Sequence, residues 1–495
     1  MTGRGGTVLK LDRVERNDLP FQDMFKKVLI ANRGEIATRV IRACKDLDIA
    51  TVAIYSEADA TSLYVKKADE AYLVGPGPIN GYMNIHNIID LARKVEVDAI
   101  HPGYGFLAEN PRLPKLCERM GITFIGPSSS SIANMGDKVK ARAMMIKAGV
   151  PVLPGSEGSV GDVTEAAEVA AKIGYPVMVK ASAGGGGRGL RIARHEDELK
   201  GAFEAAQTET KGAFGKGDVF IEKFLENPHH IEIQIMADKH GKIVHLGERD
   251  CSIQRRHQKL IEIAPSLLLD EETRVKMGDA AIRAARAAEY TNAGTVEFLV
   301  DKELNFYFLE MNTRIQVEHT ITEEVTGIDI VKKQIKIAAG EELGISQNAV
   351  RARGFAMECR ICTEDPKNNF LPNAGTVTAY YSPGGIGVRI DGALYKDYEI
   401  PGYYDSMVVK LIVKGSDWSE VVGRMHRSLE EFVVRGVKTN IPYLRKIMHD
   451  EDFREGNFDT GYIGRKPDLL EYEEFEEPVD KVAAISAAIA AFHGF

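Results

Sequence analysis

Residues 290–320, YTNAGTVEFLVDKELNFYFLEMNTRIQVEHT, decide how this chain folds and where its chemistry lies. Polar and apolar residues alternate up to Val300, and a second extended run leads through Phe308 into Glu310, with a turn expected near residues 302–304. This pattern predicts a β-hairpin. Pairing of its two strands brings Glu297 close to Glu310. Because neighbouring carboxylates repel each other in an apolar sheet, we expect a cation between them.

The same segment supplies ligands for such a cation. Glu297, Glu310 and the amide of Asn312 offer oxygen atoms, a set that suits Mg²⁺ or Mn²⁺ rather than zinc. A dense polar run follows, which amphipathicity alone does not explain: Arg314, Gln316, Glu318 and His319. The alternative is an exposed charged hairpin, but the phenylalanines beside the acids argue against it. The segment therefore predicts an active site.

Composition limits the classes of protein to which the chain can belong. Its 495 residues are enough for about three domains. The formal net charge of −9 argues against general binding of nucleic acid or of a membrane surface. The longest apolar run, residues 482–492, is too short to span a membrane, and the first 24 residues lack the pattern of a secretory signal. Five scattered cysteines favour a reducing compartment, so we expect a cytoplasmic protein with neither nucleic acid nor membrane as a partner.

The N-terminal block, residues 25–136, has the pattern of a parallel α/β unit. A buried strand over residues 28–31 leads through a turn at Gly34 into a helix and then into a strand over residues 51–55, which is a βαβ pattern. Further strands are predicted over residues 98–101 and 123–126. Because the turn holds a single glycine, the dinucleotide fingerprint is absent, and we expect a Rossmann-like domain without NAD.

The central block, residues 137–349, contains a glycine run that follows a strand. The strand over residues 175–182 carries Lys180 near its end and leads into AGGGGRG, whose glycines lie within residues 184–189. Such a loop can wrap a polyphosphate with its backbone N–H groups, although a flexible linker is the alternative. Lys138 opens the preceding helix and supplies a second cation. Together these elements indicate a nucleotide site.

Other features of the central block border this site. His230, Glu232 and Gln234 alternate with isoleucines, which predicts an antiparallel strand with one dry face and one wet face along a cleft. A single amphipathic helix over residues 322–343 is expected to close the block. A basic run is either a solvated surface or a candidate anion site: Arg255, Arg256, His257 and Lys259.

The rest of the chain is predicted to form an antiparallel β-rich domain with helices, residues 350–465, followed by a tail, residues 466–495. Short strands alternate with Pro-Gly and Gly-Gly turns, and helices are expected over residues 417–434 and 439–450. Cys359 and Cys362 are interpreted as packing residues of a strand. The tail combines an acidic stretch with the apolar helix of residues 481–492, which either folds back on this domain or docks onto another subunit. The fold class is therefore a mixture of α/β and α+β.

Several sequence blocks, in a fixed order, carry a family resemblance. The most specific are RDCSIQRRHQK at residues 249–259 and EMNTRIQVEH at residues 310–319, and others are ANRGEIA, HPGYGFLAEN, KASAGGGGRG and YYDSMVVKL. From about residue 26 to about residue 463 the chain resembles biotin carboxylase, the ATP-grasp component of biotin-dependent carboxylases. The resemblance implies that ATP phosphorylates bicarbonate to carboxyphosphate, which breaks down and carboxylates N1 of biotin.

The resemblance also implies roles for individual residues. ATP is held by Lys138 and Lys180 together with Gly185, Gly186, Gly187, Glu222, Lys223, Leu225, His230, Gln254 and His257. Mg²⁺ or Mn²⁺, as two ions, is bound by Glu297, Glu310 and Asn312. Bicarbonate lies among Lys259, Arg314, Gln316, Val317 and Glu318, and Glu318 removes its proton. Arg360 stabilises the enolate-like oxygen of deprotonated biotin.

Partners are implied by the resemblance as well. The family's Met-Lys-Met attachment sequence is absent, so biotin is expected to arrive on a separate carrier protein or carrier subunit. A carboxyltransferase subunit and a homodimer are also implied. Thr320 stands where the family often has proline, and the C-x-x-C around Arg360 is unusual. Two alternatives stay open, namely another ATP-grasp ligase with an amine acceptor and a catalytically dead ATP-binding regulatory module. A dead module should have lost at least one of Glu297, Glu310, Arg314, Glu318 and Arg360, and all are present.

Overall fold

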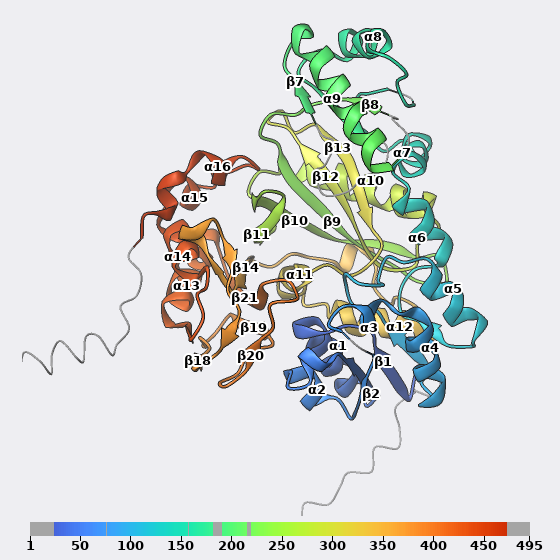
Figure 1. Cartoon of the computed structure of the whole chain (residues 1–495), viewed down its shortest axis with the longest axis vertical. Coiled ribbons are helices and arrows are strands. Elements are labelled where there is room, and N and C mark those ends of the chain that lie inside the picture. Colours follow the sequence, from blue (N-terminus) through green and yellow to red (C-terminus); the bar gives the residue numbers. More distant parts are fainter. Residues whose placement is uncertain (1–23, 76, 157, 182–190, 215–218, 473–495) are drawn as a thin grey trace, which may run out of the picture.

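The computed structural model describes residues 24–472 apart from 76, 157, 182–190 and 215–218 (Figure 1). Two predicted features fall outside the described residues. These are the glycine run, with Gly185, Gly186 and Gly187, and the apolar tail helix of residues 481–492. Within the described part of the chain, no helix combines the length and the apolar character needed to cross a membrane.

The N-terminal block folds around a five-stranded parallel sheet with the order β3-β2-β1-β4-β5, as the βαβ pattern predicted. Its first turn holds Gly34 with φ of 66°, a left-handed conformation that favours glycine. The elements of this block are β1 (Lys27–Ile30), α1 (Gly34–Asp46), β2 (Ala50–Tyr55), α2 (Leu63–Lys67), β3 (Glu70–Leu73), α3 (Asn80–Met83), α4 (Ile85–Lys94), β4 (Ala99–His101), α5 (Arg112–Arg119), β5 (Thr123–Phe124) and α6 (Ser129–Gly136).

A second sheet forms the centre of the molecule. It has eight strands in the order β13-β12-β9-β10-β11-β14-β21-β19, and all neighbouring strands are antiparallel. The sheet runs without interruption across the predicted boundary between residues 349 and 350, because β11 pairs with β14. Its strands are β9 (His229–Ala237), β10 (Ile243–Arg255), β11 (Gln258–Ala264), β12 (Asn292–Val300), β13 (Phe306–Asn312), β14 (Phe355–Cys362), β19 (Val388–Gly392) and β21 (Met407–Gly415).

A small unit stands apart at the top of Figure 1, above the β12–β13 end of the large sheet. It is the antiparallel sheet β7-β6-β8 with two helices on it, and it has a hydrophobic core of its own. The chain enters this unit through α7 (Lys138–Lys147). The unit itself consists of α8 (Val163–Ile173), β6 (Val177–Ala181), β7 (Arg191–Ala193), α9 (Glu196–Phe214) and β8 (Val219–Lys223).

The helix expected over residues 322–343 is two helices, so that prediction was wrong. Helix α11 (His319–Thr326) ends at Gly327, which has φ of 74°, and Asp329 caps the next helix, α12 (Ile330–Ala339), by accepting a hydrogen bond from the Lys332 N–H. The break lets the two helices serve different parts of the molecule. Helix α12 packs against α1 and β12, whereas α11 lies against β11, β14 and β21.

The predicted C-terminal helices are present as α13 (Trp418–Glu431) and α14 (Ile441–His449), packed together beside β14 and β21. Cys359 and Cys362 are free thiols buried on β14, which confirms their interpretation as packing residues of a strand. The remaining elements are α10 (Glu271–Ala287), which packs on β9 and β10, and the short β15 (Glu364–Asp365), β16 (Leu371–Pro372), β17 (Gly375–Thr376), β18 (Ala379–Tyr381), β20 (Glu399–Ile400), β22 (Val433–Arg435), α15 (Glu451–Glu455) and α16 (Tyr462–Arg465).

Candidate active site

The predicted hairpin is β12–β13, and its register places Glu297 directly opposite Glu310. A register shift follows immediately, between Glu297 and Phe298. The Phe298 ring meets Phe306 and Phe308 edge to face, with centroids 5.5 and 6.5 Å apart. One side of the hairpin is therefore anchored in the apolar core, and the paired carboxylates are fixed by the strands that carry them.

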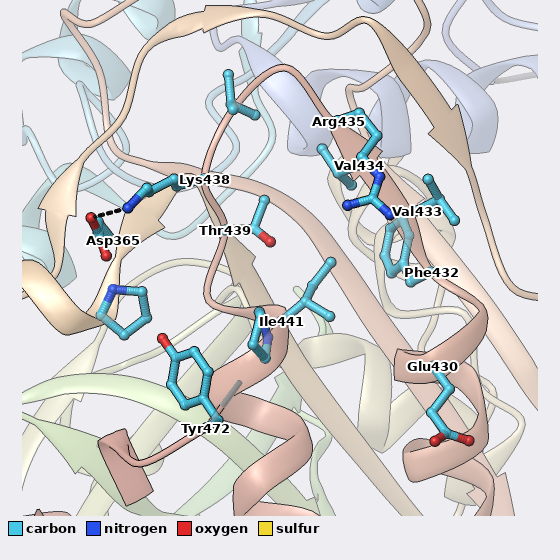
Figure 2. A pocket seen from close by; sticks show the side chains of 13 residues that line it. Asp365, Glu430, Phe432, Val433, Val434, Arg435, Lys438, Thr439, Ile441 and Tyr472 are labelled. Atoms are coloured by element: carbon cyan, nitrogen blue, oxygen red, sulfur yellow. Dashed lines mark hydrogen bonds and ion pairs between the residues drawn. The ribbon is translucent and has the colours of Figure 1, made fainter. Parts of the chain in front are cut away.

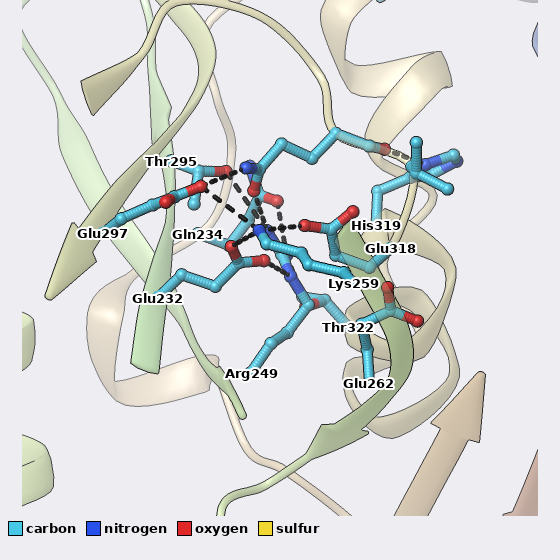
Figure 3. A network of polar contacts seen from close by, with 12 residues as sticks. Glu232, Gln234, Arg249, Lys259, Glu262, Thr295, Glu297, Glu318, His319 and Thr322 are labelled. Carbon is cyan, nitrogen blue, oxygen red and sulfur yellow. Dashed lines mark hydrogen bonds and ion pairs between the residues drawn. The ribbon is translucent and has the colours of Figure 1, made fainter. Parts of the chain in front are cut away.

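A buried arginine that sequence reasoning did not single out organises the polar side of the large sheet. The Arg249 side chain is fully buried on β10, and Figure 3 shows it reaching toward polar groups from several elements. Its Nε donates to Glu232 Oε1 at 2.5 Å. Its terminal nitrogens donate at 2.7–3.1 Å to a ring of oxygens from Gln234, Thr322, Thr295 and Gln316. Arg249 thus ties β9, β12 and α11 together beneath the site.

Lys259 on β11 is the cation around which the acids gather. Its Nζ donates to Glu232 Oε2 at 2.6 Å, to Glu318 Oε1 at 2.6 Å and to Glu297 Oε1 at 3.2 Å (Figure 3). Burial acts to lower the pKa of Lys259, but the Cys251 thiol and these carboxylates hold it well above its ordinary value. Lys259 therefore carries a firm positive charge inside the protein.

Glu318 lies between two cations. Besides Lys259, the Arg360 NH2 group donates to Glu318 Oε2 at 2.9 Å, while Arg360 Nε donates to Glu262 Oε1 at 2.6 Å. Burial acts to raise the pKa of Glu318, yet Lys259, Arg360 and Arg249 together bring it well below its usual range. Glu318 is consequently a buried carboxylate that stays charged.

The candidate metal ligands lie at the edge of this network. Glu297 accepts hydrogen bonds from Asn312 Nδ2 at 2.8 Å and Gln316 Nε2 at 2.7 Å, and its Oε2 lies 2.8 Å from His230 Nε2. Against the effect of burial, Lys259 and His230 lower the pKa of Glu297. Glu310 is exposed at the edge of the hairpin, and partial desolvation together with the adjacent Glu297 raises its pKa.

The donor set fits a divalent cation. Among the described residues the Glu310 side chain has no hydrogen-bond or ion-pair partner, and it lies opposite a charged carboxylate whose repulsion a cation would relieve. The Asn312 amide oxygen accepts a hydrogen bond from Arg314 Nη2 at 2.9 Å, while its nitrogen donates to Glu297. Asn312 therefore links Glu297 to Arg314. Arg314 is also held by Glu109 of the N-terminal block, at 3.0 Å.

The residues expected to hold ATP are split between the small unit and the large sheet. Lys180 on β6 is paired with Glu222 on β8, and Lys223 Nζ donates to the carbonyls of Gly174 and Tyr175 at 3.1 and 2.8 Å. Lys138 is the first residue of α7. The others are His230 on β9, Leu225 just after β8, Gln254 opposite Lys259, and His257, exposed at the β10–β11 turn.

The basic run was left open between a solvated surface and an anion site. Arg255 and Arg256 donate to Asn369 Oδ1 at 2.6 and 3.2 Å, whereas Lys259 joins the cluster of acids. One prediction about this sheet, which concerns β9, was wrong. The polar face of β9 is not wet, because His230, Glu232 and Gln234 are all buried. Their partners are side chains such as Arg249 and Lys259 instead of water.

A cavity of about 180 Å³ in the C-terminal region shares no residue with this network. It lies beside Tyr472, where the described chain ends, and the side chains of Phe432, Val433 and Lys438 face it (Figure 2). The Lys438–Asp365 ion pair, at 2.7 Å, crosses one side of it. The candidate chemistry therefore lies on the large sheet and not in this cavity.

Three models of known families match this chain. The family model described as biotin carboxylase, N-terminal domain, matches residues 24–132. The model for the carbamoyl-phosphate synthase L chain, ATP binding domain, matches residues 137–346. The model for the biotin carboxylase C-terminal domain matches residues 358–465. Almost the whole described chain is thus accounted for by three family models in the expected order.

Individual relatives cover most of the chain. The 2-oxoglutarate carboxylase small subunit of Hydrogenobacter thermophilus is 56% identical over 471 residues, 95% of this chain and 100% of that protein. Biotin carboxylase 1 of Bacillus subtilis is 53% identical over 442 residues, 89% of this chain and 98% of its own length.

A solved structure gives the same result. It is the dimer of the biotin carboxylase domain of the H. thermophilus 2-oxoglutarate carboxylase, in complex with MgADP, ADP and bicarbonate. It is similar to this chain with a TM-score of 0.86 and 56% identity, covering 91% of this chain and all of the other. The three family models, the relatives of this identity and the likeness to the solved structure establish that the chain belongs to the biotin carboxylase family, the ATP-dependent ligases that the sequence resemblance predicted.

Proposed function

We propose that this chain carboxylates N1 of biotin on a separate carrier, using ATP and bicarbonate, and supplies that carboxyl group to a carboxyltransferase. The observation that supports this most is the placement of Glu318 between Lys259 and Arg360, which puts a carboxylate base and two fixed cations in one buried site. A base flanked by cations suits the activation of a small anion next to an acceptor that develops negative charge.

In this proposal the nucleotide lies between the small unit and the large sheet. Lys138, Lys180 and the glycines of residues 184–189 contact the phosphates, and Glu222, Lys223 and Leu225 contact the base. Glu297, Glu310 and Asn312 hold Mg²⁺ or Mn²⁺, and two ions are proposed. When bound there, the metal neutralises charge on the phosphates during phosphoryl transfer.

Bicarbonate is proposed to lie against Lys259, Arg314 and Glu318, beside Gln316 and Val317. Hydrogen bonds fix the positions of Gln316 and Val317. Arg249 donates to Gln316 at 2.8 Å, and Lys410 donates to the carbonyl of Val317 at 2.8 Å. These contacts hold the loop before α11 from beneath. A small planar anion then meets groups that need little rearrangement.

The lowered pKa of Glu318 makes its carboxylate a weak base, whereas its proposed role is to remove a proton from bicarbonate. In the ligand-free arrangement Lys259 and Arg360 both donate to it, and each lowers its proton affinity. A bound bicarbonate competes for the hydrogen bonds of Lys259 and adds negative charge nearby, and both effects raise the pKa of Glu318. The base is therefore weak until its substrate arrives.

Several finer assignments follow from the same proposal. We propose Arg360 as the group that stabilises negative charge on biotin, the homodimer as the assembly, and a carrier and a carboxyltransferase subunit as partners. The relative named as the small subunit of a 2-oxoglutarate carboxylase supports a multi-subunit enzyme. A cytoplasmic location is proposed because all five cysteines are free and buried.

The direct test is an assay of the purified chain for ATP hydrolysis. We expect hydrolysis that requires bicarbonate and Mg²⁺ and that increases when free biotin is added, because biotin consumes the activated carboxyl group. The assay follows ADP and carboxylated biotin together. Equal rates with and without biotin would contradict the proposal. Stimulation by an amine in place of biotin would favour the alternative ligase.

The tail can be tested in the same preparation. Deleting residues 473–495, which spares Tyr472 on the core of the C-terminal domain, is expected to leave thermal stability and activity with free biotin unchanged, and to weaken copurification with the carrier and carboxyltransferase subunits. The reason is that an apolar helix of about a dozen residues is marginal alone and gains stability by burial against a partner. A large fall in melting temperature with assembly intact would show instead that the tail packs on this subunit.

A further inference from the structure

Two glutamates lie side by side beneath Arg360. Glu262 on β11 is the direct cross-strand partner of Glu358 on β14, so both side chains leave the same face of the sheet. That face is covered by α11, and neither glutamate is exposed to solvent. Two charged carboxylates at adjacent buried positions would repel each other strongly.

The hydrogen bonds of the pair leave two oxygens unused. Glu262 Oε1 accepts from Arg360 Nε at 2.6 Å, and Glu358 Oε2 accepts from the Thr320 hydroxyl. The other oxygens, Glu262 Oε2 and Glu358 Oε1, are buried without a hydrogen-bond partner. A proton on Glu358 would make its carboxyl a donor beside the Glu262 carboxylate, which occupies the directly opposite position on the same face of the sheet.

The surrounding charges indicate which glutamate is neutral. Arg360 lies two residues beyond Glu358 on the same strand and pairs directly with Glu262, so the charge belongs on Glu262. Lys410, opposite Arg360 on β21, is engaged by Glu35 at 3.2 Å and by the Val317 carbonyl. The titratable groups that interact with the pair are Arg360, Lys259, Glu318, Lys410, Tyr104, Cys251 and Cys359.

We propose that Glu262 and Glu358 share one proton, with Glu262 charged and Glu358 neutral, and that this pair is the positioning device that orients Arg360 toward biotin. The inference rests on the proposed role of Arg360. Neither glutamate touches substrate. Each acts through the guanidinium, whose two donor edges are directed to Glu262 and Glu318.

The pair gives the reaction a pH dependence. Burial raises the pKa of Glu262 to about 7, against the opposing effect of Arg360. Burial also raises the pKa of Glu358 well above its usual value, so Glu358 keeps its proton when Glu262 loses its own. Below about pH 7 both are neutral and Arg360 Nε loses its charged partner. The biotin-dependent rate should therefore rise with pH through this range.

The experiment compares pH profiles of the biotin-dependent rate for Glu262→Gln, Glu358→Gln and Glu358→Met, with the concentration of bicarbonate ion held constant at each pH. Glu262→Gln is expected to lower the rate by about 10- to 100-fold, because a charge-assisted hydrogen bond is replaced by a neutral one. It should also remove the limb of the pH profile near pH 7, which is the range over which the rate rises with pH. Glu358→Gln keeps a neutral donor and should stay within about threefold of the wild type. Glu358→Met removes that donor, which raises the pKa of Glu262 and moves the limb to higher pH.

The matched control is Glu248→Gln, which neutralises another buried glutamate of the same sheet, paired with Arg274 at 2.7 Å away from the site. It should change stability without moving the limb. An unchanged limb in Glu262→Gln, or equal profiles for Glu358→Gln and Glu358→Met, would overturn the proposal.

A readout independent of activity separates this inference from the proposed function. Because the pKa of Glu262 is higher in the folded chain than in the unfolded one, stability is lost as pH rises toward 7. The melting temperature of the wild type should therefore fall relative to that of Glu262→Gln between about pH 5 and pH 7. A constant difference would count against the shared proton, even in a preparation that biotin does not stimulate.

Discussion

Replacing Glu318 by glutamine is expected to remove most of the biotin-dependent ATP hydrolysis while MgADP binding survives. Loss of a general base typically costs about 10²- to 10⁴-fold in rate. No neighbour can substitute, because Glu232 and Glu297 are already engaged by Arg249, Lys259 and His230. The measurement is a steady-state rate together with the stabilisation that MgADP gives to the melting transition.

The fold should tolerate this change. Lys259 keeps two carboxylate partners, Glu232 and Glu297, and Arg360 keeps Glu262. The matched control is Glu323→Gln on α11, the helix that begins directly after Glu318; its carboxylate pairs with Arg39 at 2.8 Å and with Arg389 at 2.9 Å, outside the site. A comparable loss of rate in Glu323→Gln, or loss of MgADP binding in Glu318→Gln, would show that Glu318 acts as a structural anchor rather than as a base.

Replacing Arg249 by methionine is expected to destabilise the chain more than any substitution of an exposed charge. The change leaves Glu232 with Lys259 as its remaining cation and removes the donor to Gln234, Thr295 and Gln316. Removing one partner of a buried ion pair costs about 3–5 kcal/mol. For a chain of about 500 residues this corresponds to roughly 1 °C per kcal/mol, so the melting temperature should fall by about 3–5 °C.

Two further variants identify the cause of that loss. Arg427→Met breaks an exposed pair with Glu431 on α13 and should change stability by less than about 1 kcal/mol. The double variant Arg249→Met with Glu232→Leu removes both buried charges and should recover part of the stability without recovering activity. A melting temperature of Arg249→Met within about 1 °C of the wild type would mean that water or a rearranged side chain replaces the guanidinium.

Local pattern was sufficient wherever one strand pair decided the outcome. The alternation before Val300 and the aromatic run before Glu310 predicted the hairpin, and the register did bring the two glutamates together. The βαβ pattern around Gly34 predicted the parallel sheet for the same reason, since hydrophobic periodicity is a local property.

Contacts between strands that are distant along the chain could not be predicted from the sequence. Arg249 gave no signal of its burial, because its partners come from four other segments of the chain and only the sheet order brings them together. The same holds for Glu262 and Glu358, which are far apart in the sequence and become neighbours through the β11–β14 pairing. The sequence also left open where Arg255 and Arg256 point, because that depends on the turn, with φ of 50° at Arg256, and on the contact with Asn369.

A cut between residues 349 and 350 would not release two self-sufficient proteins. The C-terminal fragment would begin with β14 as an open edge, since its partner β11 would remain on the other piece. Unpaired strand edges promote aggregation. In addition, Lys259 and Arg360, the two cations that donate to Glu318, would lie on different fragments. The same edges are complementary to each other, so the two fragments would suit a split enzyme whose activity reports on their reassembly.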